Sequence, residues 1–275
     1  MDAVAEGTRA AASLVLLTPT DDGEYKVLMI QRAKTMKFLP DVWAFPGGAV
    51  DQADAASPVA QRDPTLGPFR SAAVRETAEE TGVVVRLGDT AAAHRADVPV
   101  FAHWVTPKEE GNRRFDTWFF LHVLDPTADA RDALPALTPQ PGEVANAKWV
   151  SPWEALKLSA TAKRGFRLAP PTWVLLHLLA QYRSPRKCAA SLAMKFGNDP
   201  KKVPRVMPVV GIDELWPVAK EPEAAEDATP QLLLKIPAAS TALQPDEFVV
   251  LQPSPSGPRV RVVPVGPAAG HSSNL

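Results

Sequence analysis

The residues whose types and spacing could do chemistry lie together in an acidic string, RETAEETG, at positions 75–82. A helical pattern runs from about residue 68 to residue 81, and at about 100° per residue Glu76, Glu79 and Glu80 fall within one arc. Like charges at this spacing repel one another, so the cluster calls for a counter-charge. Carboxylate oxygens are the preferred ligands of hard divalent cations such as Mg²⁺ and Mn²⁺. The string therefore indicates a metal site, with an ordinary solvated acidic face as the alternative.

The opposite side of the same helix is expected to pack on a sheet, because Val74, Ala78 and Thr81 gather there. Upstream, a strand predicted at 42–45 runs into the glycine turn PGG at 46–48. A strand, a glycine turn and an acidic helix in this order set metal ligands beside backbone N–H groups that can approach a phosphate. This layout favours the metal interpretation.

The acidic string resembles a motif of a known family. The segment RETAEETGV at 75–83 is similar to the second half of the Nudix box, GX5EX7REUXEEXGU, and Gly48 stands at its opening glycine. Members of this family hydrolyse nucleoside diphosphates linked to another group, with divalent metals held by the box glutamates on an α/β/α sandwich with a mixed central sheet. The resemblance implies the same fold and reaction here. It also implies that Glu76, Glu79 and Glu80 bind Mg²⁺ or Mn²⁺, that Glu76 and Glu80 are catalytic, and that Arg75 and Gly82 are structural.

The sequence departs from the motif in its middle. Between Gly48 and Arg75 lie 26 residues, whereas the box has 13. Counting forward from Gly48, the first glutamate of the box falls on Asp54; counting back from Arg75, it falls on Gly67. Asp54 could keep a shorter carboxylate there, and a loop-capping aspartate is the alternative. Thr77 stands where the box has an apolar residue.

The insertion itself resembles one branch of the family. With KFLP at 37–40, FPGG at 45–48 and LAPPT at 168–172, it looks like the coenzyme A diphosphatase branch related to the mammalian Nudix-type 19 enzymes. This resemblance implies coenzyme A or an acyl-coenzyme A as the substrate. A Nudix hydrolase of ADP-ribose or dinucleotides stays open, as does a non-catalytic Nudix-fold nucleotide sensor, although the intact glutamate triplet speaks against the sensor.

Several residues outside the box are candidates for catalysis or for phosphate binding. A carboxylate outside the helix often orients the attacking water in this family. Glu143 is the first choice for that role, Asp116 the second, and Glu109 and Glu110 follow. Phosphate binding is expected from cationic side chains and from the glycine turn, with surface charge as the alternative for each cation: Arg32, Lys37, Arg113, Arg114, Gly47 and Gly48.

Composition limits the other possibilities. The 275 residues carry 30 Lys and Arg against 31 Asp and Glu, so no basic field points to nucleic acid or to an anionic membrane. Cys188 is the single cysteine, which excludes an internal disulfide, and five scattered histidines lack zinc-ligand spacing. No apolar run reaches the roughly 18 residues of a membrane helix. We expect a soluble cytoplasmic protein whose partner is a small nucleotide-derived molecule, and whether it forms a homodimer stays open.

The elements that must position these residues follow from hydrophobic patterns and turn signals. A Nudix domain is predicted at 10–198, including C-terminal helices, followed by a Pro- and Ala-rich extension at 199–275 that is either small β elements or partly disordered. Strands are predicted at 13–18, 25–31, 42–45, 83–85, 98–105, 115–123, 145–150, 231–236, 247–251 and 259–263, the first two as a hairpin. Helices are predicted at 68–81, from 151 onward, at 172–182 and at 185–195.

Overall fold

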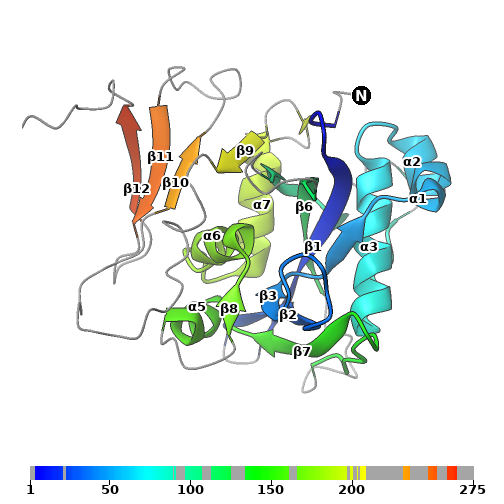
Figure 1. Ribbon diagram of the computed structural model, residues 1–275, viewed down its shortest axis with the longest axis horizontal. Coiled ribbons are helices and arrows are strands. Elements are labelled where there is room, and N and C mark those ends of the chain that lie inside the picture. Colours follow the sequence, from blue (N-terminus) through cyan, green and yellow to red (C-terminus); the bar gives the residue numbers. More distant parts are fainter. Residues whose placement is uncertain are drawn as a thin grey trace, which may run out of the picture.

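The computed structural model describes residues 4–20, 23–88, 90, 97–106, 113–124, 134–160, 166–196, 199–200, 203, 205–208, 232–235, 247–252 and 259–264. These residues form a mixed sheet with helices against it (Figure 1). The strands are β1 Arg9–Pro19, β2 Tyr25–Arg32, β3 Val42–Ala44, β4 Gly47–Ala49, β5 Val100–Val105, β6 Phe115–Val123, β7 Val144–Val150, β8 Arg167–Leu168, β9 Arg205–Pro208, β10 Leu232–Lys235, β11 Glu247–Gln252 and β12 Arg259–Pro264. The helices are α1 Gln52–Ala56, α2 Pro58–Arg62, α3 Gly67–Thr81, α5 Pro152–Ala160, α6 Pro170–Leu179 and α7 Pro185–Phe196.

The sheet has the strand order β12-β11-β10-β9-β5-β6-β1-β2-β3-β8, with β4 paired to β1 and β7 to β2. The β1–β6, β3–β8 and β5–β9 pairs are parallel and the others antiparallel. The central strand β1 is buried on both faces, since Leu14, Val15, Leu16 and Leu17 are all fully buried. Helix α3 packs on β1, and α7 contacts β1, β5 and β6; Figure 1 shows these two helices on opposite sides of β1. The predicted α/β/α class is therefore confirmed.

Most predicted elements are present, with shifted ends. The β1–β2 hairpin forms, with Pro19 opposite Tyr25. The segment 83–85 is not a strand: Val83 and Val85 are buried and Val84 is exposed, as in a strand, but no described strand pairs with it. The alternation of buried and exposed side chains at 83–85 therefore reflects contact with the core and not strand pairing.

Several short elements were not predicted from the sequence. Strand β4 replaces part of the expected turn, because it pairs with Ala11–Ser13 of β1. The segment after β4 forms α1 and α2, which precede α3. Strands β8 and β9 also escaped prediction, being too short for a period-two pattern to be recognised.

Strand β9 adds to the edge of β5, and β10, β11 and β12 continue from it as antiparallel neighbours. The predicted strands at 231–236, 247–251 and 259–263 coincide with β10, β11 and β12. The division at residue 198 stays a prediction. In the part of the chain that is described, no helix has the length and apolar character needed to span a bilayer.

Candidate active site

Helix α3 carries the acidic string and ends where the sequence predicted. Gly82 adopts the left-handed conformation, with φ of 76°, and its N–H donates to the Ala78 carbonyl. Thr77 is fully buried, and its hydroxyl donates to the Ala73 carbonyl at 2.7 Å. A threonine therefore fits the expected apolar position, because its one polar group is satisfied within the helix.

The buried face of α3 is not the one predicted. Thr81 is buried as expected, but Val74 and Ala78 are only half-buried. Glu80, expected on the opposite side, is only 4% exposed. The turn at 46–48 covers this side of the helix, and a helical wheel cannot anticipate a covering loop.

The glycine turn is held against β1 and against the glutamates. The Ser13 hydroxyl donates to the Pro46 carbonyl at 2.7 Å, and the Gly47 N–H donates to Oε2 of Glu80 at 2.8 Å. A Cβ on Gly48 would overlap the carboxylate of Glu76. Glycine at position 48 is therefore needed because the backbone passes directly against that carboxylate.

Arg75 is the centre of an ion-pair network. Its Nη2 donates to Asp54 at 2.8 Å and its Nε to the same carboxylate at 3.2 Å. Its Nη1 contacts Glu76 at 3.0 Å and Glu79 at 2.9 Å, and Nη2 also donates to the Ala49 carbonyl. This single guanidinium therefore connects α1, β4 and α3.

Asp54 caps helix α1 and also pairs with Arg75. It forms a capping box with Asp51 at the start of α1, each side chain accepting the other's backbone N–H, at 2.8 and 3.0 Å. Its carboxylate, 2% exposed, also pairs with Arg75 across 20 intervening residues. Asp54 thus supplies the carboxylate that Arg75 anchors, and α2 and the first half of α3 fill the intervening chain.

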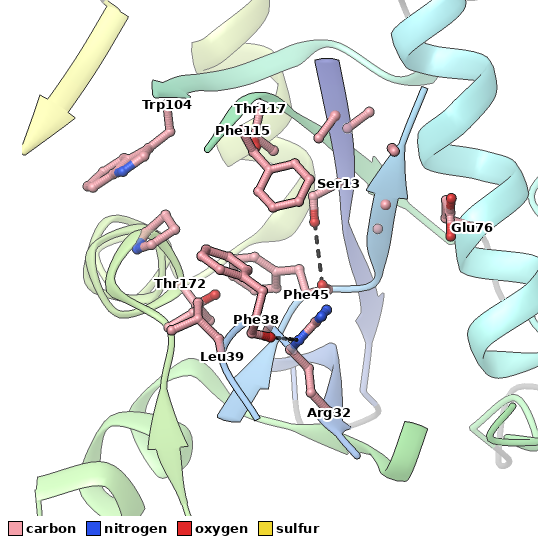
Figure 2. A pocket seen from close by; sticks show the side chains of 18 of the residues that line it. Ser13, Arg32, Phe38, Leu39, Phe45, Glu76, Trp104, Phe115, Thr117 and Thr172 are labelled. Carbon is pink, nitrogen blue, oxygen red and sulfur yellow. Dashed lines mark hydrogen bonds between the residues drawn. The ribbon is translucent and has the colours of Figure 1, made fainter. Parts of the chain in front are cut away.

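A pocket of about 510 Å³ opens beside this network. Its acidic end is formed by Glu76, Glu80 and Glu143, together with Arg32 and the glycine turn. Figure 2 shows Glu76 beside α3, across β4 from the aromatic side chains of the pocket. The Arg32 Nε donates to the Phe38 carbonyl at 3.2 Å, which fixes the guanidinium at the border between the two ends.

The electrostatics of the acidic end favour an added cation. Burial raises the pKa of Glu80 to about 8; the Gly47 hydrogen bond and Arg32 oppose this rise, and the charges of Glu76 and Glu143 add to it. Burial also raises the pKa of Glu76, against the opposing charge of Arg75. Burial lowers the pKa of Arg32, and the charges of Glu80 and Glu143 oppose that shift. Glu80 and Glu143 thus act on Arg32, while Glu76 shares Arg75 with Asp54 and Glu79, so carboxylates outnumber guanidinium groups around this end of the pocket.

These residues fit a divalent cation, as the resemblance of the acidic string implies. Among the described residues, no group of three or more Asp, Glu, His or Cys side chains is arranged so that it could hold a metal ion by itself. Glu76 and Glu80 line the pocket and offer two carboxylates one helical turn apart; Glu79 does not line it, and it contacts Arg75 as Glu76 does. Mg²⁺ is commonly held by one or two carboxylates, with waters and substrate phosphates completing its shell. Glu76 and Glu80 would therefore hold such an ion, and Glu143 lines the same pocket.

The other end of the pocket is aromatic and apolar. Phe38 and Phe115 lie with ring centroids 5.2 Å apart, tilted by 55°. Trp104, Phe45 and Phe119 line the same space, with Met36, Leu39, Ala169, Pro170, Pro171 and Thr172. This end is built from β1, β5, β6, the loop before β3 and the start of α6 (Figure 2).

Some predicted site residues lie away from the pocket. Lys37 and Arg113 are exposed and are not among its described lining residues. Arg114 is buried, and it donates to the carbonyls of Thr106 and Glu6 at 3.1 and 3.0 Å.

The remaining acids differ in position. Asp116 points to the opposite face of β6, where it accepts the Ala5 N–H and pairs with His103. Glu109 and Glu110 lie outside the described residues.

Ser13 and Arg9 are among the pocket residues that were not predicted from the sequence. Ser13 fixes the glycine turn, and Arg9 lines the pocket at the start of β1. The signal for Arg9 is the alternation Arg9, Ala11, Ser13 along one face of β1, but the apolar run that marks the strand begins only at residue 13.

Comparisons with known proteins agree with this architecture. A family model described as NUDIX domain matches residues 7–169. The chain is 29% identical over 236 residues to the Caenorhabditis elegans protein named "Putative nudix hydrolase 7", covering 76% of this chain and 71% of that protein. It is similar to the crystal structure of a NUDIX hydrolase from Alicyclobacillus acidocaldarius, with a TM-score of 0.55, 27% identity, and coverage of 67% of this chain and 96% of that one.

Proposed function

Because the chain belongs to the Nudix family and is a hydrolase of diphosphate bonds, we propose that it cleaves coenzyme A or an acyl-coenzyme A. The products are an adenosine bisphosphate and a phosphopantetheine or its acyl derivative. Water supplies the oxygen that joins one phosphorus, and the bridging oxygen leaves with the other. The diphosphate of the substrate lies at the acidic end of the pocket, and the groups on its two sides extend along the aromatic end.

The roles at the acidic end follow from the residues present. Glu76 and Glu80 would hold Mg²⁺ or Mn²⁺, which would neutralise diphosphate oxygens and activate the attacking water; Glu79 would join them only by leaving its ion pair with Arg75. Glu143 accepts the proton of that water, since it lines the same pocket as Glu80 and lies close enough for its charge to act on Glu80. The glycine turn at 47–48 orients Glu80 and Glu76 through the Gly47 hydrogen bond and the close approach of Gly48. Arg32 lies beside these carboxylates and binds a phosphate oxygen.

One observation carries the choice of substrate. The two segments that resemble the coenzyme A branch, 37–40 and 168–172, are far apart in the sequence, yet both contribute to the aromatic end of the pocket. Phe38 and Leu39 come from the first, and Ala169, Pro170, Pro171 and Thr172 from the second. A volume of about 510 Å³ lies within the usual range for small-molecule sites. Because both segments lie at the same end of the pocket, we infer that both bind the organic part of the substrate.

The rival substrates are ADP-ribose and dinucleotides, because the acidic end suits any diphosphate. The experiment is a panel of coenzyme A, acetyl-coenzyme A, ADP-ribose and diadenosine polyphosphates with Mg²⁺ or Mn²⁺, with products identified by mass. We expect the highest kcat/KM for a coenzyme A compound. Faster cleavage of ADP-ribose or of a dinucleotide would overturn the substrate, and binding without products would favour a nucleotide sensor.

A further inference from the structure

The pocket contains two cationic side chains among its described lining residues, and they have different surroundings. Arg32 lies at the acidic end, where the charges of Glu80 and Glu143 act on it. Arg9 stands at the start of β1, in the aromatic part of the pocket. One cation is therefore placed among the carboxylates, and the other is separated from them.

The sheet register fixes where Arg9 stands. Ser13 is opposite Phe119 on β6 and Gly47 on β4, and Gly47 donates to Glu80. Arg9 is opposite Phe115 and four residues from Ser13 along β1, which corresponds to about 13 Å of strand. A ligand that has its diphosphate near Glu80 must therefore extend along the sheet to meet Arg9.

Aromatic side chains line the pocket near this outer position. Phe115, the strand neighbour of Arg9, is in ring contact with Phe38. In the next row of the sheet, Trp104 lies opposite Thr117, and both line the pocket. Flat rings beside a guanidinium offer a stacking surface next to a binding site for an anion. A nucleotide with a phosphate on its sugar offers the matching groups, since its base can stack on the rings and its phosphate can bind the guanidinium.

We propose that Arg9 is a specificity-determining residue that binds a second phosphate on the nucleoside half of the substrate, apart from the diphosphate that is cleaved. This inference rests on the proposed function, since coenzyme A bears such a group as its 3′-phosphate. The sequence alone predicts Arg32, Lys37, Arg113 and Arg114 as the phosphate-binding cations. Arg32 is engaged with the acidic end, and the other three lie outside the described pocket lining. Arg9 replaces them.

The test compares Arg9→Ala and Arg9→Lys with wild type on coenzyme A and on dephospho-coenzyme A, which lacks only the 3′-phosphate. Arg183→Ala is the matched control, because Arg183 is an exposed arginine between α6 and α7 that is not among the pocket residues. We expect Arg9→Ala to lower kcat/KM for coenzyme A about tenfold, mainly through KM, and to leave dephospho-coenzyme A unchanged. Arg9→Lys should lose less, because it keeps the charge. The control should match wild type on both substrates.

The outcomes separate the Arg9 inference from the proposed function. If wild type prefers coenzyme A to its dephospho form and Arg9→Ala keeps that preference, the inference is overturned while the proposed function stands. If wild type cleaves both forms equally well, no residue reads the 3′-phosphate and the inference again fails. If wild type cleaves neither form but does cleave ADP-ribose, both are overturned. A melting curve for each variant shows that the comparison is made on folded protein.

Discussion

The two ends of the pocket are built in different ways. The acidic end draws Glu76 and Glu80 from one turn of α3, and it is fixed by the Gly47 hydrogen bond, the close approach of Gly48 and the Arg75–Asp54 ion pair. The aromatic end draws its side chains from several segments that are far apart in the sequence. Rigid placement of charged groups suits chemistry, in which small displacements matter, whereas a looser apolar wall suits binding. Changes at the acidic end should therefore act on kcat, and changes at the aromatic end on KM.

The largest expected effect is that of Glu80→Gln. Glutamine has nearly the same size and still offers an oxygen to the Gly47 N–H, but it removes a charge from the metal site. We expect kcat to fall at least about a hundredfold, with the melting temperature preserved. Glu76→Gln should behave similarly, and the two losses should not add, because both act on the same ion. Glu154→Gln, in an exposed part of α5, is the control; near-normal turnover of Glu80→Gln would refute the assignment.

Asp54→Asn tests the support of the acidic end. It keeps the shape of the side chain but removes the buried charge that faces Arg75, so the free energy of unfolding should fall by about 1.5–3 kcal/mol. The matched control is Asp51→Asn, whose carboxylate is 50% exposed and 3.9 Å from the same guanidinium. That variant should lose less stability. Denaturant unfolding measures both, and an equal loss in the two variants would contradict a special role for Asp54.

Gly48→Ala probes the close approach of the glycine turn. The added methyl group would meet the Glu76 carboxylate, which must shift, so we expect kcat to fall about tenfold. Gly23→Ala is the comparison, because Gly23 has φ of +80° and no other atom within 4 Å of the added methyl. It should cost about 1 kcal/mol of stability and spare turnover. Steady-state kinetics and melting curves measure both variants. A normal kcat for Gly48→Ala together with a reduced kcat for Gly23→Ala would contradict the prediction.

Phe38→Leu should give the smallest effect. Loss of the ring that contacts Phe115 removes about 1 kcal/mol of aromatic contact, or roughly a fivefold rise in KM with kcat unchanged. Phe166→Leu is the control, because Phe166 stacks on Trp43 and is not among the pocket residues. It should leave KM unchanged. A fall in kcat for Phe38→Leu with constant KM would show that the two ends do not divide binding from chemistry.

The difference between the two ends also decides what the sequence could predict. Glu76, Glu80 and Gly82 stand in one contiguous motif, so their chemistry and their helix could be predicted together. The pairing of Asp54 with Arg75 could only be offered as an alternative, since the 20 residues between them hide the contact. Arg9 and Trp104 come together through strand register, which depends on long-range pairing that a single sequence does not reveal.

The predicted cations show the same limit. Arg32, Lys37, Arg113 and Arg114 were chosen by residue type near expected loops, but only Arg32 reaches the pocket in the part of the chain that is described. Arg114 satisfies backbone carbonyls instead. Whether a charged side chain faces a ligand, solvent or the backbone is set by packing, and residue type alone does not determine it.

Binding of Mn²⁺ tests most directly whether the acidic end is a metal site. Wild type and Glu80→Gln are titrated with Mn²⁺ alone, and the bound ion is followed by electron paramagnetic resonance, which does not depend on the substrate. We predict saturable binding by wild type and at least about tenfold weaker binding by Glu80→Gln, with Glu154→Gln equal to wild type. Equal Mn²⁺ affinity in wild type and Glu80→Gln would contradict the account of this site.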